Sequence, residues 1–386
     1  MIVGVPRETY PGERRVALVP SVIPNLAKAG LEVVVEAGAG VEAGYPDADY
    51  AAKGAKVLTD RAKVFEVADI VVQVLCHGSN DATGKADLPL LHRDQVLIGF
   101  LRPLGAIETI DEVAATGATS FSVELMPRTT RAQSMDALSS MGTICGYKAV
   151  LLAADALPRL FPMMTTAAGT ITPARVFIIG AGVAGLQAIA TARRLGAIVT
   201  ATDVRPATKE QVESLGAKFL AVEDEEFKNA QTAGGYAKEM SKEYQAKQAA
   251  LVAEHVKKQD IVITTALIPG RPAPKLISKE MVASMRPGSV IVDLAVERGG
   301  NVEGAKAGEI VQVGPAKIVG YLNVAGRLAA SASALYAKNL LTFLDTMIDK
   351  KDKKLAVNWD DEIVKGTLLT RDGAVVHPNF KPKTAA

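Results

Sequence analysis

The sequence lacks most features that mark secreted, membrane-spanning or nucleic-acid-binding chains. Its 386 residues include only two cysteines, Cys76 and Cys145, which lie far apart, form no metal-type spacing and suit a reducing compartment. No apolar run reaches about 18 uninterrupted residues, and the first residues, MIVGVPRETY, show no basic segment followed by an apolar run. Lys and Arg total 44 against 42 for Asp and Glu, a net charge of +2, so no basic field favours nucleic acid. We therefore expect a cytoplasmic enzyme or binding protein without a membrane span, a metal site or a nucleic-acid partner.

The chain is instead rich in short, alternating strand-like and helix-like segments. A length of 386 residues is too great for one ordinary core and favours two domains. Within the first 125 residues, helix-like segments that end at Gly30 and Gly117 separate β-branched apolar runs, a rhythm typical of a parallel sheet covered by helices. The predicted strands of this region are 2–6, 31–38, 68–75, 95–101 and 118–125.

A long helix over 134–157 leads to a second α/β unit that begins near residue 173. The stretch 221–255 interrupts its rhythm, and we interpret 223–240 as a mobile loop followed by a helix from about 241. A final helix over 327–349 and a hairpin turning at Asp372-Gly373 return to the first domain. The predicted domains are therefore 1–135 with 328–386, and 136–327.

Three glycines after the predicted strand RVFII form the pattern of a dinucleotide-binding turn. Gly180 permits the tight turn, Gly182 lets the backbone approach a pyrophosphate, and Gly185 allows close helix–strand packing. Asp203 follows Gly185 by 18 residues, at the end of the next strand, where a carboxylate accepts from the adenosine ribose. Such an aspartate repels a 2′-phosphate and favours NAD(H), although Arg205 is a contrary signal for NADP(H). The alternative is a plain glycine turn with an aspartate in solvent.

Seven segments together resemble one enzyme family. They are MPRTTRAQSMDALSS, TAAGT, GAGVAGLQAIATARRLGA, TDVRPATKEQVESLGAKF, TAGGYAKEM, TTALIPGRPAP and RPGSVIVDLAVERGGN. They are similar to the NAD(H)-binding domain I of proton-translocating NAD(P)+ transhydrogenase, and the resemblance covers essentially the whole chain. It implies an α/β fold of two Rossmann-like domains with parallel sheets and a nucleotide cleft between them.

The resemblance also implies partners. The chain is expected to form a homodimer that binds NAD(H), with NADP(H) on a partner domain and a separate membrane subunit that translocates protons. Such a chain is cytoplasmic and peripheral at the inner membrane through these subunits. It ends at KPKTAA, which resembles the arrangement in which this domain is a soluble subunit of its own.

The segment 127–140, PRTTRAQSMDALSS, has no histidine, cysteine or lysine. Hydride transfer between two nicotinamides needs orientation and exclusion of water but no proton donor, so such a segment suits it. By resemblance, Arg128, Gln133 and Asp136 form a polar triplet around the nicotinamide and its ribose. Asp136 would accept hydrogen bonds, Gln133 would bridge toward the second nucleotide, and Arg128 would brace Asp136. Beside them the resemblance places Ser134, Met135 and Ser139.

The other expected nucleotide contacts lie in the second domain. They are Gly180, Gly182, Val183, Gly185, Asp203, Val204, Arg205, Gly235, Tyr236, Thr265, Ala266 and Leu267. Tyr236 would close over the nucleotide as a lid, and Leu267 would line its path. Simpler interpretations remain open: Arg131 as a surface charge or interdomain brace, Tyr236 in a solvated loop, Met135 in the core, and the serines as caps of the helix near Asp136.

Two other functions stay open. Alanine dehydrogenase resembles this chain in fold, but that family places a lysine and a histidine at the ends of two first-domain strands for acid–base chemistry. Gln73 and Phe100 stand at the matching places here and cannot do that work, although His77 and His92 lie nearby in the sequence. A non-catalytic NAD-sensing subunit is the remaining possibility.

Overall fold

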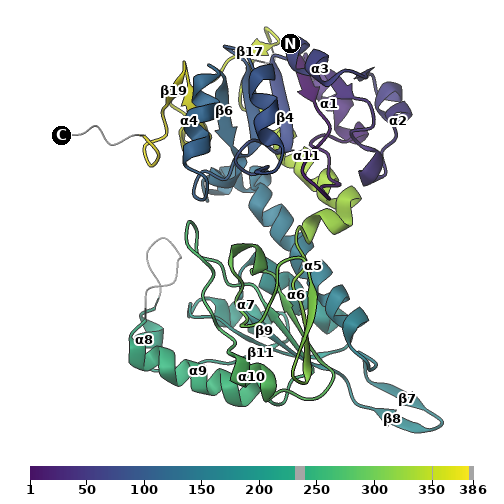
Figure 1. The fold of residues 1–386 in the computed structure, drawn as a ribbon, viewed down its shortest axis with the longest axis vertical. Helices are drawn as coiled ribbons and strands as arrows, with labels where there is room; N and C mark the ends of the chain where they lie inside the picture. Colours follow the sequence, from purple (N-terminus) through teal and green to yellow (C-terminus); the bar gives the residue numbers. More distant parts are fainter. Residues whose placement is uncertain (231–239, 350, 382–386) are drawn as a thin grey trace. The chain divides into compact units, whose positions relative to one another are not determined.

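The computed structural model describes residues 1–230, 240–349 and 351–381, which form two compact units. The first unit is Met1–Met141 with Ala325–Ala386, and the second is Gly142–Val324. Each unit is an α/β body built on one large, mostly parallel sheet (Figure 1). The predicted fold class is therefore confirmed. The functional domain limits at 135/136 and 327/328 stay a prediction.

The sheet of the first unit has eight strands in the order β19-β18-β6-β5-β4-β1-β2-β3. All the strands from β1 to β6 pair in parallel, and the central ones are buried on both faces, as the apolar runs predict. These strands are β1 (Ile2–Val5), β2 (Glu32–Glu36), β3 (Lys56–Leu58), β4 (Ile70–Leu75), β5 (Val96–Phe100) and β6 (Thr119–Ser122). The helices of this unit include α1 (Ile23–Lys28), α2 (Asp47–Ala52), α3 (Arg61–Val67), α4 (Glu108–Ala115), α11 (Ala329–Asp345) and α12 (Glu362–Thr367).

The C-terminal hairpin completes this first sheet. Strand β18 (Leu368–Arg371) pairs antiparallel with β6 and with β19 (Ala374–Val375). At the turn Asp372 has φ 54° and Gly373 has φ 81°, the two left-handed residues that a tight hairpin turn requires. The predicted turn is confirmed. The two-stranded pair β16 (Ile348–Asp349) and β17 (Lys354–Leu355) precedes it.

The sheet of the second unit has seven strands in the order β11-β10-β9-β12-β13-β15-β14. Only β14 runs antiparallel, because it pairs with its neighbour in the chain. The strands are β9 (Arg175–Ile179), β10 (Ile198–Thr202), β11 (Lys218–Phe219), β12 (Ile261–Thr264), β13 (Ser289–Asp293), β14 (Ile310–Val313) and β15 (Ala316–Val319). The helices are α6 (Val183–Arg194), α7 (Thr208–Ser214), α8 (Glu225–Lys228), α9 (Lys242–Val256) and α10 (Lys279–Ala283).

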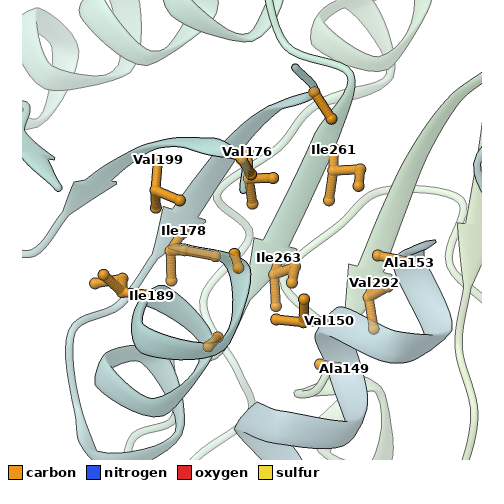
Figure 2. Close-up of a cluster of buried hydrophobic side chains, with 14 of the residues drawn as sticks. Ala149, Val150, Ala153, Val176, Ile178, Ile189, Val199, Ile261, Ile263 and Val292 are labelled. Carbon is orange, nitrogen blue, oxygen red and sulfur yellow. The ribbon is translucent and has the colours of Figure 1, made fainter. Parts of the chain in front are cut away.

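The long helix α5 (Ala137–Ala156) begins in the first unit and continues into the second. Within the described residues, it alone is long and apolar enough to cross a membrane, by length and composition. Its residues Ala149, Val150 and Ala153 are fully buried in the second unit. Figure 2 shows them packed near Ile263 of β12 and Val292 of β13. This stretch of α5 therefore serves as a core helix.

The interrupted region at 221–255 contains more regular structure than the sequence predicts. Short helix α8 lies within the expected loop 223–240, with Asp224 as its cap. Helix α9 begins close to the predicted start, and the Ser241 side chain accepts a hydrogen bond from the Tyr244 amide as its N-cap. Residues 231–239 lie outside the described residues.

A two-stranded hairpin, β7 (Met164–Thr166) and β8 (Gly169–Ile171), extends from the second unit after α5 (Figure 1). It belongs to neither large sheet. Its root carries exposed apolar side chains: Leu160 is 45% exposed, Met163 64% and Met164 42%. Apolar exposure of this kind is typical of a surface that another chain covers.

Candidate functional site

The glycine turn lies where the second sheet reverses its strand order. Strand β9 sits between β10 and β12, so the chain leaves it in opposite directions, and ligands bind at the carboxyl ends of such strands. Gly180 follows β9 directly and has φ +100°, a conformation that L side chains rarely adopt. A Cβ atom there would lie 2.5 Å from Oγ1 of Thr265, which follows β12. The turn therefore requires glycine.

The other two glycines shape the start of α6. A Cβ atom at Gly185 would lie 1.8 Å from the carbonyl oxygen of Gly180, so only glycine lets the helix pack this close to the turn. At Gly182, the N-cap, a Cβ atom would meet nothing within 4 Å. The backbone is thus open at the N-terminus of a helix, where amide groups and the helix dipole favour a phosphate.

Asp203 follows β10, and four donors surround its carboxylate. The Ala181 amide donates to Oδ2 at 2.8 Å, which ties the carboxylate to the glycine turn. The Arg205 amide and Nε each donate to Oδ1 at 2.9 Å, and a terminal nitrogen of Arg205 donates to Oδ2 at 2.8 Å. The hydrogen bonds and negative charge of Asp203 raise the pKa of Arg205 above its ordinary value. The two signals that the sequence set against each other are therefore one ion pair.

The segment after β12 is held by a side chain to which the sequence pattern assigned no role. Asn301 is fully buried, and its Oδ1 accepts from the Ala266 amide at 3.0 Å. Its Nδ2 donates to the carbonyl oxygens of Ala266 at 2.9 Å and Pro274 at 2.8 Å. One amide therefore clamps both ends of the segment that carries Ala266 and Leu267. The signal in the sequence was the polar residue after Gly-Gly in the segment RGGN.

A second residue without a predicted role, Asp293, holds the turn that carries Asn301. It ends β13, and its carboxylate accepts from the amides of Ala295 and Val302 and from the Thr264 hydroxyl. A Cβ atom at Gly300 would lie 2.6 Å from its Oδ2. Burial raises the pKa of Asp293, and the hydrogen bonds oppose that shift. The Asp293–Asn301 turn thus fixes the backbone beside the glycine turn.

Exposed apolar side chains surround the same carboxyl edge of the sheet. Val183 is 44% exposed at the start of α6, Val204 is 38% exposed beside Asp203, and Leu267 is 54% exposed after β12. All three were expected nucleotide contacts. Apolar surfaces next to phosphate- and ribose-binding groups suit the flat rings of a dinucleotide.

In the first unit, Asp136 caps α5. Its Oδ1 accepts from the Ser139 amide at 2.9 Å, and its Oδ2 accepts from the Ser139 hydroxyl at 2.6 Å. The amide of Ser140 adds a bond to the Asp136 carbonyl oxygen. The interpretation of this segment as a helix cap is therefore correct, with Asp136 rather than a serine as the cap. Asp136 and Ser139 are brought together, as a positioning role for both requires.

The segment before Asp136 is a short 3-10 helix, Thr130–Met135, held from two sides. Asn339 of α11 donates to the Ser134 carbonyl oxygen at 2.8 Å. Arg131 forms an ion pair with Asp361 at the start of α12, so it braces this unit internally. Met135 is only 4% exposed, which favours the core interpretation for it. Arg128 and Gln133, in contrast, are exposed.

The positions that alanine dehydrogenase uses for acid–base chemistry have structural roles here. Gln73 is buried, and its Nε2 donates to Asp87 at 3.0 Å. Phe100 stacks on Tyr336, with ring centroids 5.5 Å apart. Nε2 of His77 lies 2.5 Å from Glu112, so that ring is engaged with α4. Nδ1 of the other candidate, His92, lies 3.0 Å from the carbonyl oxygen of Arg93, its neighbour in the chain.

Two expected contacts, Gly235 and Tyr236, lie outside the described residues. Among the residues that the structure does describe, no group of three or more histidines, cysteines or acids is placed to hold a metal ion. The remaining site residues fall into one set in each unit. The set Arg128–Ser139 belongs to the first unit, and the set around Gly180, Asp203 and Thr265 belongs to the second.

A separate buried acid lies at the carboxyl edge of the first sheet. Glu8 follows β1, and its carboxylate accepts from the amides of Val74 at 2.6 Å and Leu75 at 3.1 Å. Burial, together with the charge of Glu13, raises the pKa of Glu8 to about 8, and the two amides oppose this. Glu13 itself forms a buried ion pair with Arg15 at 2.6 Å.

Comparison with known proteins agrees with this arrangement. Residues 4–145 match the family model for the alanine dehydrogenase/PNT N-terminal domain, and residues 149–378 match that for the C-terminal domain. An NAD(P) transhydrogenase subunit alpha chain of Rhodospirillum rubrum is 52% identical over 98% of both chains. A transhydrogenase structure from Sinorhizobium meliloti has a TM-score of 0.87 and 55% identity, covering 97% of this chain and 100% of its own. An L-alanine dehydrogenase structure has a TM-score of 0.80 but 27% identity, covering 98% of both chains. The chain therefore belongs to the alanine dehydrogenase/PNT family, on its NAD(P) transhydrogenase subunit alpha side.

Proposed function

We propose that this chain is the NAD(H)-binding subunit of a proton-translocating NAD(P) transhydrogenase. Its 52% identity over nearly full length to a transhydrogenase subunit alpha chain carries this proposal. The strained glycine turn, the open N-terminus of α6 and the acid after β10 support NAD(H) as its nucleotide. NADP(H) would bind on a partner domain, and a membrane subunit would move the proton.

Direct hydride transfer gives the polar segment of the first unit a role. The reaction moves a hydride from C4 of one dihydronicotinamide to C4 of another, so no side chain takes or gives a proton. Catalysis then depends on fixing one ring. Asp136 is fixed by Ser139, and the segment before it by Asn339 and Arg131. We infer that Asp136, Ser139, Gln133 and Arg128 orient the nicotinamide end of NAD(H).

In the second unit, Gly180, Gly182 and Gly185 would take the pyrophosphate and Asp203 the ribose. The exposed side chains of Val183, Val204 and Leu267 would contact the rings. Ser134, Met135, Arg205, Gly235, Tyr236, Thr265 and Ala266 complete the proposed set. We also propose a homodimer, which the exposed apolar root of the β7–β8 hairpin supports.

Amide substitutions of the orienting residues test the proposal. Gln133→Asn and Asp136→Asn should slow hydride transfer to an NADP(H)-binding partner domain by about 100-fold while NADH affinity falls less than about threefold. Asn at 136 still accepts the Ser139 amide, so a slower rate would not come from loss of the helix cap. Stopped-flow absorbance gives the rate, and a fluorescence titration gives the affinity.

Asp60→Asn is the matched control, because Asp60 caps α3 in the same unit through the Ala62 amide. It should leave both rate and affinity unchanged. If NADH affinity collapses in the Gln133 and Asp136 variants while the rate at saturating NADH is intact, the segment is a binding clamp and the orienting role is wrong.

A further inference from the structure

The Asp203–Arg205 pair occupies the atoms that a ribose would use. Two of the four donors on the Asp203 carboxylate are backbone amides, of Ala181 and Arg205, which the fold holds in place. The other two are Nε and a terminal nitrogen of the Arg205 side chain, one on each oxygen. This is the two-point geometry in which a guanidinium binds a carboxylate most strongly.

An adenosine ribose presents the same two donors. Its 2′- and 3′-hydroxyls would each donate to one carboxylate oxygen, as the guanidinium nitrogens do. A carboxylate offers about four acceptor positions, and the two amides already use two of them. The ribose and the Arg205 side chain therefore need the same remaining pair. The Arg205 side chain is 26% exposed against 7% for Asp203, so it is the partner that can turn away into solvent.

We propose that Arg205 competes with the adenosine ribose for Asp203, so that the pair, and not Asp203 alone, sets the choice between NAD(H) and NADP(H). This inference rests on the proposed NAD(H) function. Arg205 weakens the binding of NAD(H) by holding the acceptor that the ribose needs. It is also a cation placed where a 2′-phosphate would lie, but Asp203 holds it.

The two residues thus act in opposite directions on each nucleotide. With Asp203 present, a 2′-phosphate meets a carboxylate and must draw the guanidinium away from it, so NADP(H) is disfavoured. With an amide at 203, the ion pair is lost, and the guanidinium is free to bind the phosphate. Selectivity for NAD(H) therefore depends on Asp203 keeping Arg205 engaged.

Three variants of the full chain separate these effects: Arg205→Ala, Asp203→Asn and the double variant. Dissociation constants for NADH and NADPH come from calorimetry at one fixed, low ionic strength, because salt screens both the ion pair and the phosphate. Lys209→Ala is the matched control. It removes one positive charge near Arg205, from an exposed pair with Glu223 that does not touch Asp203.

Arg205→Ala should bind NADH about three- to tenfold more tightly, because the competitor is gone. Asp203→Asn should bind NADH about tenfold more weakly and NADPH at least about tenfold more tightly. The double variant should lose most of that NADPH gain. Lys209→Ala should match the unmodified chain for both nucleotides.

NADH binding to Arg205→Ala that is no tighter than that of the unmodified chain overturns the competition. An equal NADPH gain in Asp203→Asn and in the double variant overturns the role of Arg205 in selectivity. Either result, with NADH still bound by the unmodified chain, leaves the proposed function intact. If the unmodified chain does not bind NADH, the proposed function and this inference fall together.

Discussion

Single residues in the first sheet carry a charge balance that depends on pH. In the folded chain the Glu8 carboxyl has a pKa of about 8, against 4.5 as its ordinary value, because it is buried. Between these values the folded state binds a proton that the unfolded state has lost. The stability from this group is fully present below about pH 4.5 and is lost as the pH rises through about 8.

Glu8→Gln tests that balance, because glutamine is neutral at every pH and keeps an acceptor for the amides of Val74 and Leu75. The unmodified chain should lose stability toward pH 8.5 at up to about 1.4 kcal/mol per pH unit, and the variant should lose less. Urea unfolding of both chains between about pH 5 and about pH 8.5 measures the difference. Parallel profiles would show that Glu8 does not titrate in the folded state as the structure indicates.

At the scale of elements, the sequence predicts the strands and glycine turns well and the clamps poorly. Strands β1, β4 and β9 are buried on both faces, so their apolar runs stand out, whereas β3 is short and half exposed and was not predicted. Asn301 and Asp293 were not predicted to have roles, because their partners are mainly backbone groups of the loops beside them. A pattern of side chains does not reveal such contacts.

The Asn301 clamp makes a prediction for the whole segment from β12 to Pro274. Asn301→Ala leaves the Ala266 amide and the carbonyl oxygens of Ala266 and Pro274 without this partner, so the segment should lose its fixed position. NADH affinity should fall about tenfold, and the second unit should unfold more easily, by about 1–3 kcal/mol. Calorimetric titration and thermal unfolding measure the two effects.

Asn229→Ala is the control for that variant. Asn229 also donates to a backbone carbonyl oxygen in the second unit, that of Glu225, but at the surface. It should leave NADH affinity unchanged. A folded Asn301→Ala chain with the affinity of the unmodified chain would mean that the clamp does not position the nucleotide.

At the scale of the whole molecule, the sequence and the structure divide the site into two sets with different tasks. The set in the second unit has the geometry of a nucleotide anchor: a strained turn, an open helix start and an acid at a strand end. The set in the first unit has a capped helix start and a braced polar segment without a proton donor. The places at which alanine dehydrogenase needs acid–base groups hold a buried glutamine and a stacked phenylalanine. This combination favours hydride exchange between nucleotides over oxidation of an amino acid.

Hydride exchange is measured most directly by mixing the full chain with an NADP(H)-binding domain from a transhydrogenase. With NADH and a bound NADP+ analogue, we predict rapid hydride exchange, seen as the change in dihydronicotinamide absorbance of the two nucleotides. With NAD+ and alanine in place of the partner domain, we predict that no NADH forms. No exchange with the partner domain, together with NADH production that depends on alanine, would contradict the proposed function.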